Sequence, residues 1–563
     1  MLGIGFLAVL VASASKEKKV TIEANSVLKL DLNAPIHDRA ENNPWAMLDM
    51  DNPRLKRSIG LAEIRQAIKK AKTDNNIKGI YLYLANNENG LATVDALRES
   101  LLDFKQSGKF VYAYGEYISQ KSYYLATAAD KIYMNPSGDM MLTGFGRQIS
   151  YYKNALDKLG VEVQDFHCGA FKSAIEPFIR SNMSEPNRQQ LTTIYNDVYS
   201  YFLNNISKER KIDTAQLNTI INNLEAETPQ KDKELKLIDD DIYYDQVVDK
   251  MKEKTGTDKK KDIQFVELGK YASTIAKKLP SENKIAVIYA EGNIVGGEGK
   301  DDEIGDVTYA KLVHKLANDD NIKAIVLRVN SPGGSALASD IIWRELVLAK
   351  KQKPLVVSFG DVAASGGYYI SCEADRIFAQ SNTITGSIGV FGLIPNAQKL
   401  LTDKLGITFD EVKVTKHGVF GGITKPLDAQ ESAVIQRNVE KTYREFKQRV
   451  AEGRKKDTAY IESIAQGRVW TGHQAIANGL VDEIGGLDEA IAYAAKQANL
   501  KNYRLKEYPE EKSFMEKMVE GFGDAKMQYM KEQLGDQYEM YNTLQWLKNT
   551  KGVQARMVYD LGL

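Results

Sequence analysis

The chain has 563 residues, of which 43% are hydrophobic and 27% are charged, an ordinary globular composition. Lysine plus arginine and aspartate plus glutamate number 75 each, so the formal net charge is zero and the basic excess typical of a nucleic-acid-binding surface is absent. The length exceeds that of a common single domain, so we expect two or more domains. The five histidines lack metal-ligand spacing, and Cys168 and Cys372 form no zinc motif or disulfide framework, although a single bridge between them stays open.

The N-terminus begins with an uncharged apolar run from Leu2 to Ala14, followed at once by KEKK. A membrane-spanning helix needs about 20 apolar residues, so this run alone is short. No positive residues precede it as in a signal peptide, although VASAS has the small residues of a cleavage region. Three interpretations remain. The run is a secretory signal, or the remaining end of a membrane anchor in a sequence whose start was placed too late, or a buried first strand or helix. We favour a signal or anchor remnant over residues 1–18.

The sequence contains a long internal repeat. NIKGIYLYL (76–84) resembles NIKAIVLRV (321–329), and at the same separation the segment 110–134 resembles the segment 355–379. A repeat this long indicates two copies of a domain. The charged stretch KEKTGTDKKKD (252–262) suits a linker between them. We therefore expect one copy at 19–262, a second at 263–505 and a C-terminal extension at 506–563.

Within each copy, short β-branched runs alternate with helical patterns. In the second copy KAIVLRVN, PLVVSFG and DRIFAQ are strand candidates, while ASDIIWRELVLAKK and GYYISCEA carry apolar residues at helical spacing. This alternation predicts an α/β fold with a largely parallel sheet flanked by helices. Residues 516–547 are rich in Met, Tyr, Gln and charge, which favours an amphipathic helix in the extension.

The two copies differ where chemistry is expected. The second copy has VNSPGGSA (329–336) after a strand, where the first has LANNENGL, and Ser365 aligns with Gln120. If small residues served only helix packing, the first copy should need them too. A diglycine lets backbone N–H groups approach a ligand closely. The N–H groups of Gly334 and Gly366, beside the Ser365 hydroxyl, therefore predict an oxyanion hole.

A nucleophilic serine needs a base, and the residues alone do not single one out. His417, in TKHGVF, is the histidine nearest to motif-like sequence. Lys172, in CGAFKSAIEPF, has small and apolar neighbours that could desolvate it and lower its pKa. Glu176 lies four residues on and could instead form an ion pair that keeps Lys172 charged.

Four segments carry a resemblance to a known family: NSPGGSA, DVAASGGYYISCEADRI, TGSIGVFG and GRVWTGHQAIANGLVDEIGG. Together they resemble the signal peptide peptidase A (protease IV) family in its long, duplicated form, over roughly residues 45 to 500. The resemblance implies two tandem Clp protease/crotonase-like domains and a Ser–Lys dyad. It makes Ser365 the nucleophile, Lys172 in FKSAIEPF the base, and Ser387 in TGSIG the residue that orients the lysine amine. Short family members take their lysine from the region aligned with 416–418, so Lys416 is a second candidate.

The resemblance also implies a setting for the enzyme. Its substrates would be cleaved signal peptides, which are short, apolar and unfolded, and no metal or other cofactor is expected. An N-terminal anchor would hold a homotetramer in the bacterial inner (cytoplasmic) membrane, with the catalytic body facing the periplasm.

Two other functions stay open from the residues. A crotonase-type acyl-CoA enzyme would use the same fold and oxyanion hole on a thioester enolate, without an activated serine. A non-catalytic scaffold would use the duplication only for assembly.

Overall fold

The computed structural model describes residues 21–32, 34–40, 59–275, 281–510, 552–557 and 561–563. The expected N-terminal signal or anchor at 1–18 and the expected helix at 516–547 lie outside these residues. Among the helices within them, none has both the length and the apolar character needed to cross a membrane.

The first repeat is built on a six-stranded sheet in which every neighbouring pair of strands is parallel. The strand order is β6 (Asp240–Asp241), β4 (Lys131–Met140), β3 (Phe110–Ile118), β2 (Ile77–Leu84), β1 (Ser26–Asp31) and β7 (Phe265–Glu267). Its helices are α2 (Leu61–Thr73), α3 (Leu91–Lys105), α4 (Gln120–Ala126), α8 (Thr214–Asn222), α9 (Pro229–Glu234), α10 (Tyr244–Thr255) and α11 (Leu268–Ala272). Parallel strands need such helical crossovers, as the alternating pattern predicts.

The second repeat has a sheet that is parallel except for the antiparallel pair β15–β17, in the order β17 (Val469–Thr471), β15 (Ile384–Gly386), β13 (Leu355–Ala364), β11 (Ile322–Ser331), β8 (Lys284–Glu291) and β19 (Arg504–Tyr508). Strand β14 (Arg376–Ala379) pairs with β13, and β18 (Glu483–Ile484) pairs with β14. Its helices are α12 (Asp306–Ala317), α13 (Ala336–Lys350), α14 (Gly366–Ser371), the π-helical turn η2 (Leu400–Lys404), α15 (Ala429–Arg454), α16 (Thr458–Ile464), α17 (Gly472–Ala477) and α18 (Leu487–Gln497). The strands and helices expected from the sequence at 323–380 are all present.

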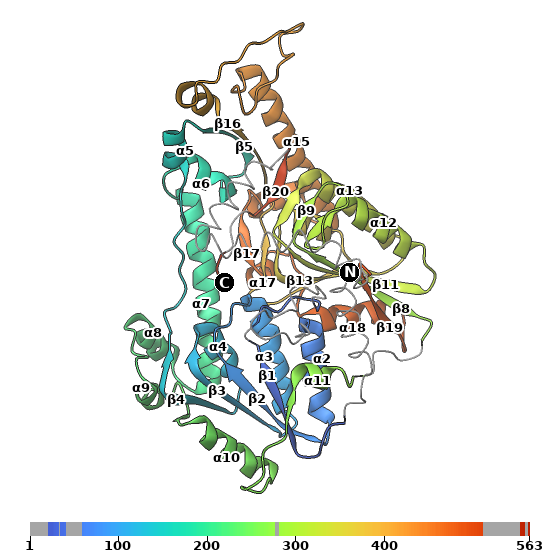
Figure 1. Ribbon diagram of the computed structural model, residues 1–563. Coiled ribbons are helices and arrows are strands. Elements are labelled where there is room, and N and C mark those ends of the chain that lie inside the picture. The colour runs from blue at the N-terminus through green and yellow to red at the C-terminus, as the bar shows by residue number, and fades with distance from the viewer. Residues whose placement is uncertain (1–20, 33, 41–58, 276–280, 511–551, 558–560) are drawn as a thin grey trace, which may run out of the picture.

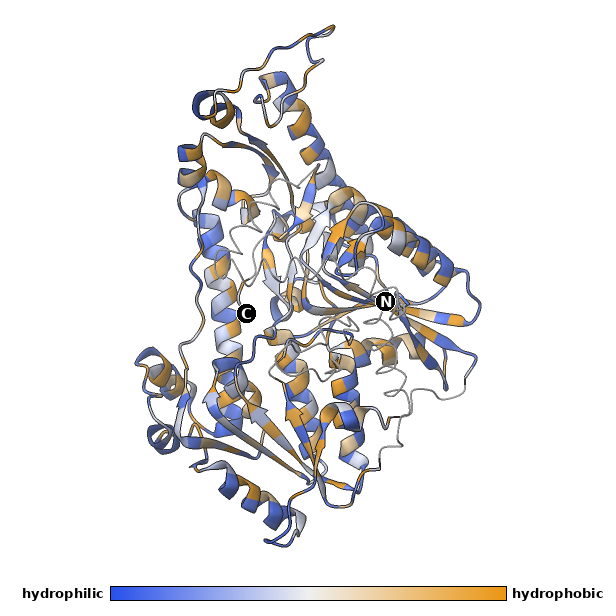
Figure 2. Cartoon of the chain, viewed as in Figure 1, coloured by the Kyte–Doolittle hydropathy of each residue, from blue (hydrophilic) through white to orange (hydrophobic). Residues whose placement is uncertain are grey.

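In both repeats a late strand returns to pair with the first strand of the sheet. Strand β7 pairs with β1, so elements of the first sheet continue past residue 262, where the sequence suggested a boundary. Strand β19 pairs with β8 and likewise crosses residue 505. Each repeat has its own apolar core. In Figure 2 the flanking helices carry hydrophobic and hydrophilic residues on the same helix, as one-sided burial requires.

A third sheet joins parts of the chain that are far apart in sequence. Its order is β10 (Glu303–Gly305), β9 (Asn293–Val295), β12 (Gly333–Ser335), β20 (Gln554–Arg556), β16 (Val390–Asn396) and β5 (Glu162–Cys168). Strand β5 comes from the first repeat and β20 from the C-terminal end. Strand β20 thus lies in the C-terminal extension, beyond the segment 516–547 in which a helix was expected.

A segment of the first repeat, residues 153–179, reaches the second repeat, and we call it the arm. It contains α5 (Lys153–Leu159), β5, the 3-10 turn η1 (Ser173–Ile175) and α6 (Glu176–Ile179). Strand β5 pairs with β16 along its whole length, from Glu162 opposite Asn396 to Cys168 opposite Val390. Figure 1 shows the long helix α7 (Glu185–Arg210) running back from α6 to the first sheet. Cys168, on the arm, and Cys372, after α14, are both free thiols.

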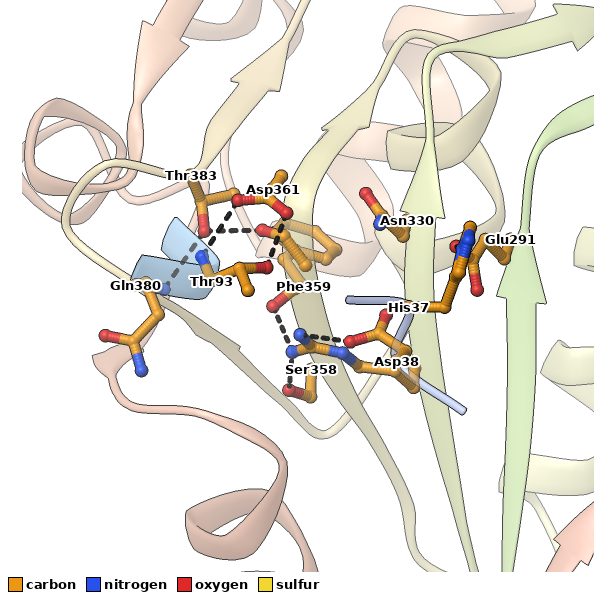
Figure 3. A network of polar contacts seen from close by, with 12 residues as sticks. His37, Asp38, Thr93, Glu291, Asn330, Ser358, Phe359, Asp361, Gln380 and Thr383 are labelled. Carbon is orange, nitrogen blue, oxygen red and sulfur yellow. Dashed lines mark hydrogen bonds and ion pairs between the residues drawn. The ribbon is translucent and has the colours of Figure 1, made fainter. Parts of the chain in front are cut away.

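The two repeats also meet through buried polar contacts (Figure 3). The Arg328 guanidinium on β11 donates to Asp38 Oδ1 at 2.7 Å, and both side chains are almost fully buried. At the start of α3, the Thr93 N–H and hydroxyl donate to the two oxygens of Asp361, at 2.9 and 2.6 Å. Buried charges need such partners, so these contacts fix the first repeat against β11 and β13 of the second.

Candidate active site

Ser365 lies at a strained turn between β13 and α14. Its backbone has φ 55° and ψ −113°, a conformation that costs a residue with a side chain about 1–3 kcal/mol. The turn is held by the Ser365 N–H, which donates to Gly386 O at 2.8 Å. In the first repeat, helix α4 begins after Ser119 in ordinary extended backbone, with φ −68° and ψ 157°. The strain is therefore a property of the repeat that carries the candidate nucleophile.

Lys172 on the arm meets Ser365 of the second repeat. The Lys172 side-chain nitrogen, Nζ, lies 2.8 Å from Ser365 Oγ. The same nitrogen lies 3.0 Å from Ser387 Oγ and 3.2 Å from Ser387 O. The three side chains are buried, with exposed fractions of 3%, 0% and 2% for Lys172, Ser365 and Ser387. Three residues that the sequence analysis named from distant segments thus share one site.

The surroundings of Lys172 disfavour its charged form. Burial lowers the pKa of Lys172 well below its ordinary value of 10.5, and no opposing charge contributes to this shift. Glu176, which could have paired with the lysine, instead accepts from the Ser184 hydroxyl and from Asn187 Nδ2 at 2.9 Å. A lysine that is neutral near pH 7 can accept a proton from a neighbouring hydroxyl.

Glycine backbone packs directly against the lysine side chain. Gly467 has φ +79°, and a Cβ added there would lie 2.6 Å from Lys172 Cβ. A Cβ added at Gly389 would lie 2.7 Å from Gly467 Cα and 3.3 Å from Lys172 Cδ. The sequence analysis quoted both glycines within motifs but assigned them no role. The sequence could have indicated this close packing, because glycine is the residue that permits so close a backbone approach.

Gln190 on α7 holds the turn that carries Lys172. Its side-chain Nε2 donates to Phe171 O at 3.1 Å and to Ser173 Oγ at 3.0 Å, on either side of the lysine. Its Oε1 accepts from the Val469 N–H at 3.2 Å, which ties the same turn to β17. No motif pointed to Gln190, since its role depends on α7 lying beside the second repeat.

The expected oxyanion donors lie beside the serine. Gly366 follows Ser365 directly, and Gly334 is the central residue of β12. The two segments are close, because a Cβ added at Gly333 would lie 2.5 Å from the Gly366 nitrogen. A Cβ added at Gly334 would lie 2.0 Å from Ile294 O, so this strand also requires glycine. The backbone of β12 therefore lies against the Gly366 nitrogen, next to the residue that carries the hydroxyl.

The other candidate bases lie at the surface. Lys416 is exposed and its ammonium group contacts Gln430. His417 contacts Glu431 at 3.2 Å and lies within reach of Asp428 as well. Within the described residues, the buried Ser365 is therefore met by Lys172 rather than by Lys416 or His417.

Comparison with known proteins gives a consistent result. The model of "Peptidase family S49" matches the chain twice, at residues 103–258 and 348–501. The "Clp protease" model matches residues 277–383. The chain is 36% identical to "Protease 4" of Salmonella typhi, over 88% of this chain and 82% of that protein.

Two further relatives carry related names. "Serine protease SPPA, chloroplastic" of Arabidopsis thaliana is 32% identical, over 95% of this chain and 78% of that protein. "Putative signal peptide peptidase SppA" of Enterococcus faecium is 36% identical, over 40% of this chain and 65% of that protein. Since the family model matches in both repeats and the two long relatives match over 88% and 95% of this chain, the chain is a serine peptidase that belongs to peptidase family S49, in its duplicated form.

Proposed function

We propose that this peptidase is an endopeptidase that degrades cleaved signal peptides through a Ser–Lys dyad. One observation carries the proposal: the Lys172 amine, which pairs with no acidic side chain among the described residues, lies 2.8 Å from the hydroxyl of a strained, buried serine. The name of the Enterococcus faecium relative supports signal peptides as the substrate class.

In the proposed mechanism, neutral Lys172 removes the proton from Ser365 as the serine oxygen attacks a peptide carbonyl carbon. The lysinium then donates this proton to the leaving amine, and an acyl-enzyme ester forms on Ser365. Water, deprotonated by the same lysine, hydrolyses the ester and restores the serine. Ser387 orients the amine, because its hydroxyl oxygen and its carbonyl oxygen lie 3.0 and 3.2 Å from Lys172 Nζ.

The oxyanion that forms during attack would be held by the N–H groups of Gly334 and Gly366. Removing one such donor typically costs about 3–4 kcal/mol of transition-state stabilisation. Neither repeat has the full set of groups, since the first contributes the lysine and the second contributes the serine and the donors. The contact between the repeats is thus part of the proposed catalytic apparatus.

The proposed setting follows the family resemblance. We place the enzyme at the bacterial inner membrane, held by an N-terminal anchor, with the catalytic body in the periplasm and a homotetramer as the assembled form. Fractionation of cells and sedimentation of the detergent-extracted protein test these two points separately.

The test of the mechanism uses three alanine variants. Ser365→Ala and Lys172→Ala should abolish casein and signal-peptide cleavage, whereas Lys416→Ala should retain it and serves as the matched control. A fluorophosphonate should label the native enzyme at Ser365, which an acyl-CoA enzyme has no reason to allow. Full activity in Lys172→Ala together with loss in Lys416→Ala would assign the base to Lys416. Cleavage that persists in Ser365→Ala would contradict the proposal entirely.

A further inference from the structure

The C-terminal end of the chain lies in the gap between two strands of the active site. Strand β20 pairs antiparallel with β12 on one side, where Gly333, Gly334 and Ser335 face Arg556, Ala555 and Gln554. On its other side β20 pairs antiparallel with β16, through Gln554 and Phe391. Without β20, both strands would present unpaired backbone groups, which is the kind of edge to which an extended peptide binds.

The register places Ala555 opposite the candidate oxyanion donor Gly334. The Met557 N–H donates to Pro332 O at 2.8 Å, and the Ala336 N–H donates to Val553 O at 3.2 Å. Hydrogen-bonded pairs alternate with non-bonded pairs in an antiparallel ladder. The pair between these two bonds, Gly334 and Ala555, is therefore of the bonded kind, with the Gly334 N–H directed at Ala555 O.

The Ala555 carbonyl also lies against the second candidate donor. A Cβ added at Gly333 would lie 2.2 Å from Ala555 O and 2.5 Å from the Gly366 nitrogen. A Cβ added at Gly366 would lie 3.0 Å from Ala555 O. The carbonyl oxygen of Ala555 is thus close to the backbone of both Gly333 and Gly366, beside Ser365. The carbonyl of a substrate would have to lie at the same place.

Residues beyond the strand close the approach to the lysine. Met557 and Leu561 line a small cavity together with Lys172, Ser387 and Val469. The Tyr195 hydroxyl on α7 donates to Leu561 O at 2.7 Å and fixes this part of the tail to the first repeat. The tail therefore accounts for part of the complete burial of Ser365.

We propose that residues 553–557 occupy the substrate groove as an intramolecular ligand, and that peptide substrates bind by replacing β20 between β12 and β16. The proposal rests on the proposed function and deepens it. The substrate must be extended over about five residues and must have a free N–H at the position of Ala555, which is the N–H that bonds to Gly334 O. Folded chains, and peptides with proline at that position, are excluded from the groove.

The test uses the full chain with one substitution in the tail. Ala555→Pro removes the N–H of the central bonded pair and should release the tail, while Ala555→Ser keeps the N–H and is the matched control. We expect Ala555→Pro to raise the rate of fluorophosphonate labelling of Ser365 and of casein cleavage about five- to tenfold, with Ala555→Ser at the wild-type rate. Equal rates in all three proteins, with Ser365-dependent activity present, would overturn the proposal.

A binding measurement keeps the proposal testable if Ala555→Pro disturbs folding, and it does not depend on catalysis. A fluorescent peptide of residues 553–563 should bind the Ser365→Ala protein more tightly when its own tail carries Ala555→Pro, and should raise the KM of the wild-type enzyme without changing kcat. The same peptide with proline in place of Ala555 should do neither. A peptide that does not compete with casein would overturn the assignment of the groove. Loss of Ser365-dependent activity in every variant, with peptide binding intact, would instead count against the proposed function.

Discussion

The variant Gly467→Ala tests how strongly kcat depends on the position of Lys172. A Cβ at this position would lie 2.6 Å from Lys172 Cβ and 2.7 Å from both the Cα and the nitrogen of Lys172, whereas ordinary contact begins at 3.4 Å. The alanine variant must therefore displace Lys172 by about 0.8 Å at its Cβ and about 0.7 Å at its backbone, the differences between 3.4 Å and the contacts at 2.6 and 2.7 Å. A misplacement of about 1 Å costs an active site about 100-fold in rate. We expect Gly467→Ala to lower kcat by roughly 30- to 100-fold.

Gly479 supplies the matched control for this variant. It has φ +76°, close to the +79° of Gly467, but its added Cβ would meet nothing nearer than Lys456 Cε at 3.4 Å. Both alanine variants carry the same backbone strain, about 1–2 kcal/mol. Gly467→Ala adds the cost of displacing the buried Lys172, about 1–3 kcal/mol, so its melting temperature should fall further than that of Gly479→Ala. The assay is kcat on casein together with the rate of fluorophosphonate labelling. If Gly467→Ala keeps the kcat of Gly479→Ala, the position of Lys172 does not depend on this glycine.

Three further predictions concern charge. Because burial lowers the pKa of Lys172 and only the neutral amine accepts a proton, kcat should fall about tenfold per pH unit below that pKa, and a flat acid limb in the pH–rate profile would argue against a lysine base. Because burial lowers the pKa of Lys172, Lys172→Met should raise the melting temperature at pH 7, and this gain should vanish as pH approaches 10.5, the ordinary lysine pKa; a gain that persists there would contradict it. Asp38→Ala should lower the free energy of unfolding in urea by about 3–5 kcal/mol, because the buried Arg328 guanidinium loses its carboxylate, and a loss of under about 1 kcal/mol would show that the pair is dispensable.

Periodicity predicts the sheets and helices that are local in sequence. The runs that become β11, β13 and α13 are apolar with strand or helix spacing, and the structure has these elements at those residues. Strand β20 was not predicted, although VQARM (553–557) alternates apolar and polar residues, because the run is short and contains no aromatic residue. It is a strand in the fold because β12 and β16 provide partners on both sides, and the identity of these partners cannot be read from the local sequence.

The active-site residues also fall into two groups: those that the sequence alone indicates, and those whose role depends on tertiary contacts. The difference between the two copies singled out Ser365 and its glycines from residues alone, because duplicated units should share whatever the fold requires. Lys172 could be chosen only through family resemblance, since the burial that lowers its pKa is created by β5 pairing with β16 and by Gly467. Gln190 escaped notice for the same reason: its partners are brought to it by the arm and by β17.

The arm determines how the activity of the enzyme depends on protein concentration. The amine and the hydroxyl travel on one polypeptide, so their stoichiometry is fixed and their encounter is unimolecular. A site shared between separate molecules would come apart on dilution, but this pair is assembled whenever the chain itself is folded. Specific activity should therefore stay constant as the enzyme is diluted, even where larger assemblies dissociate.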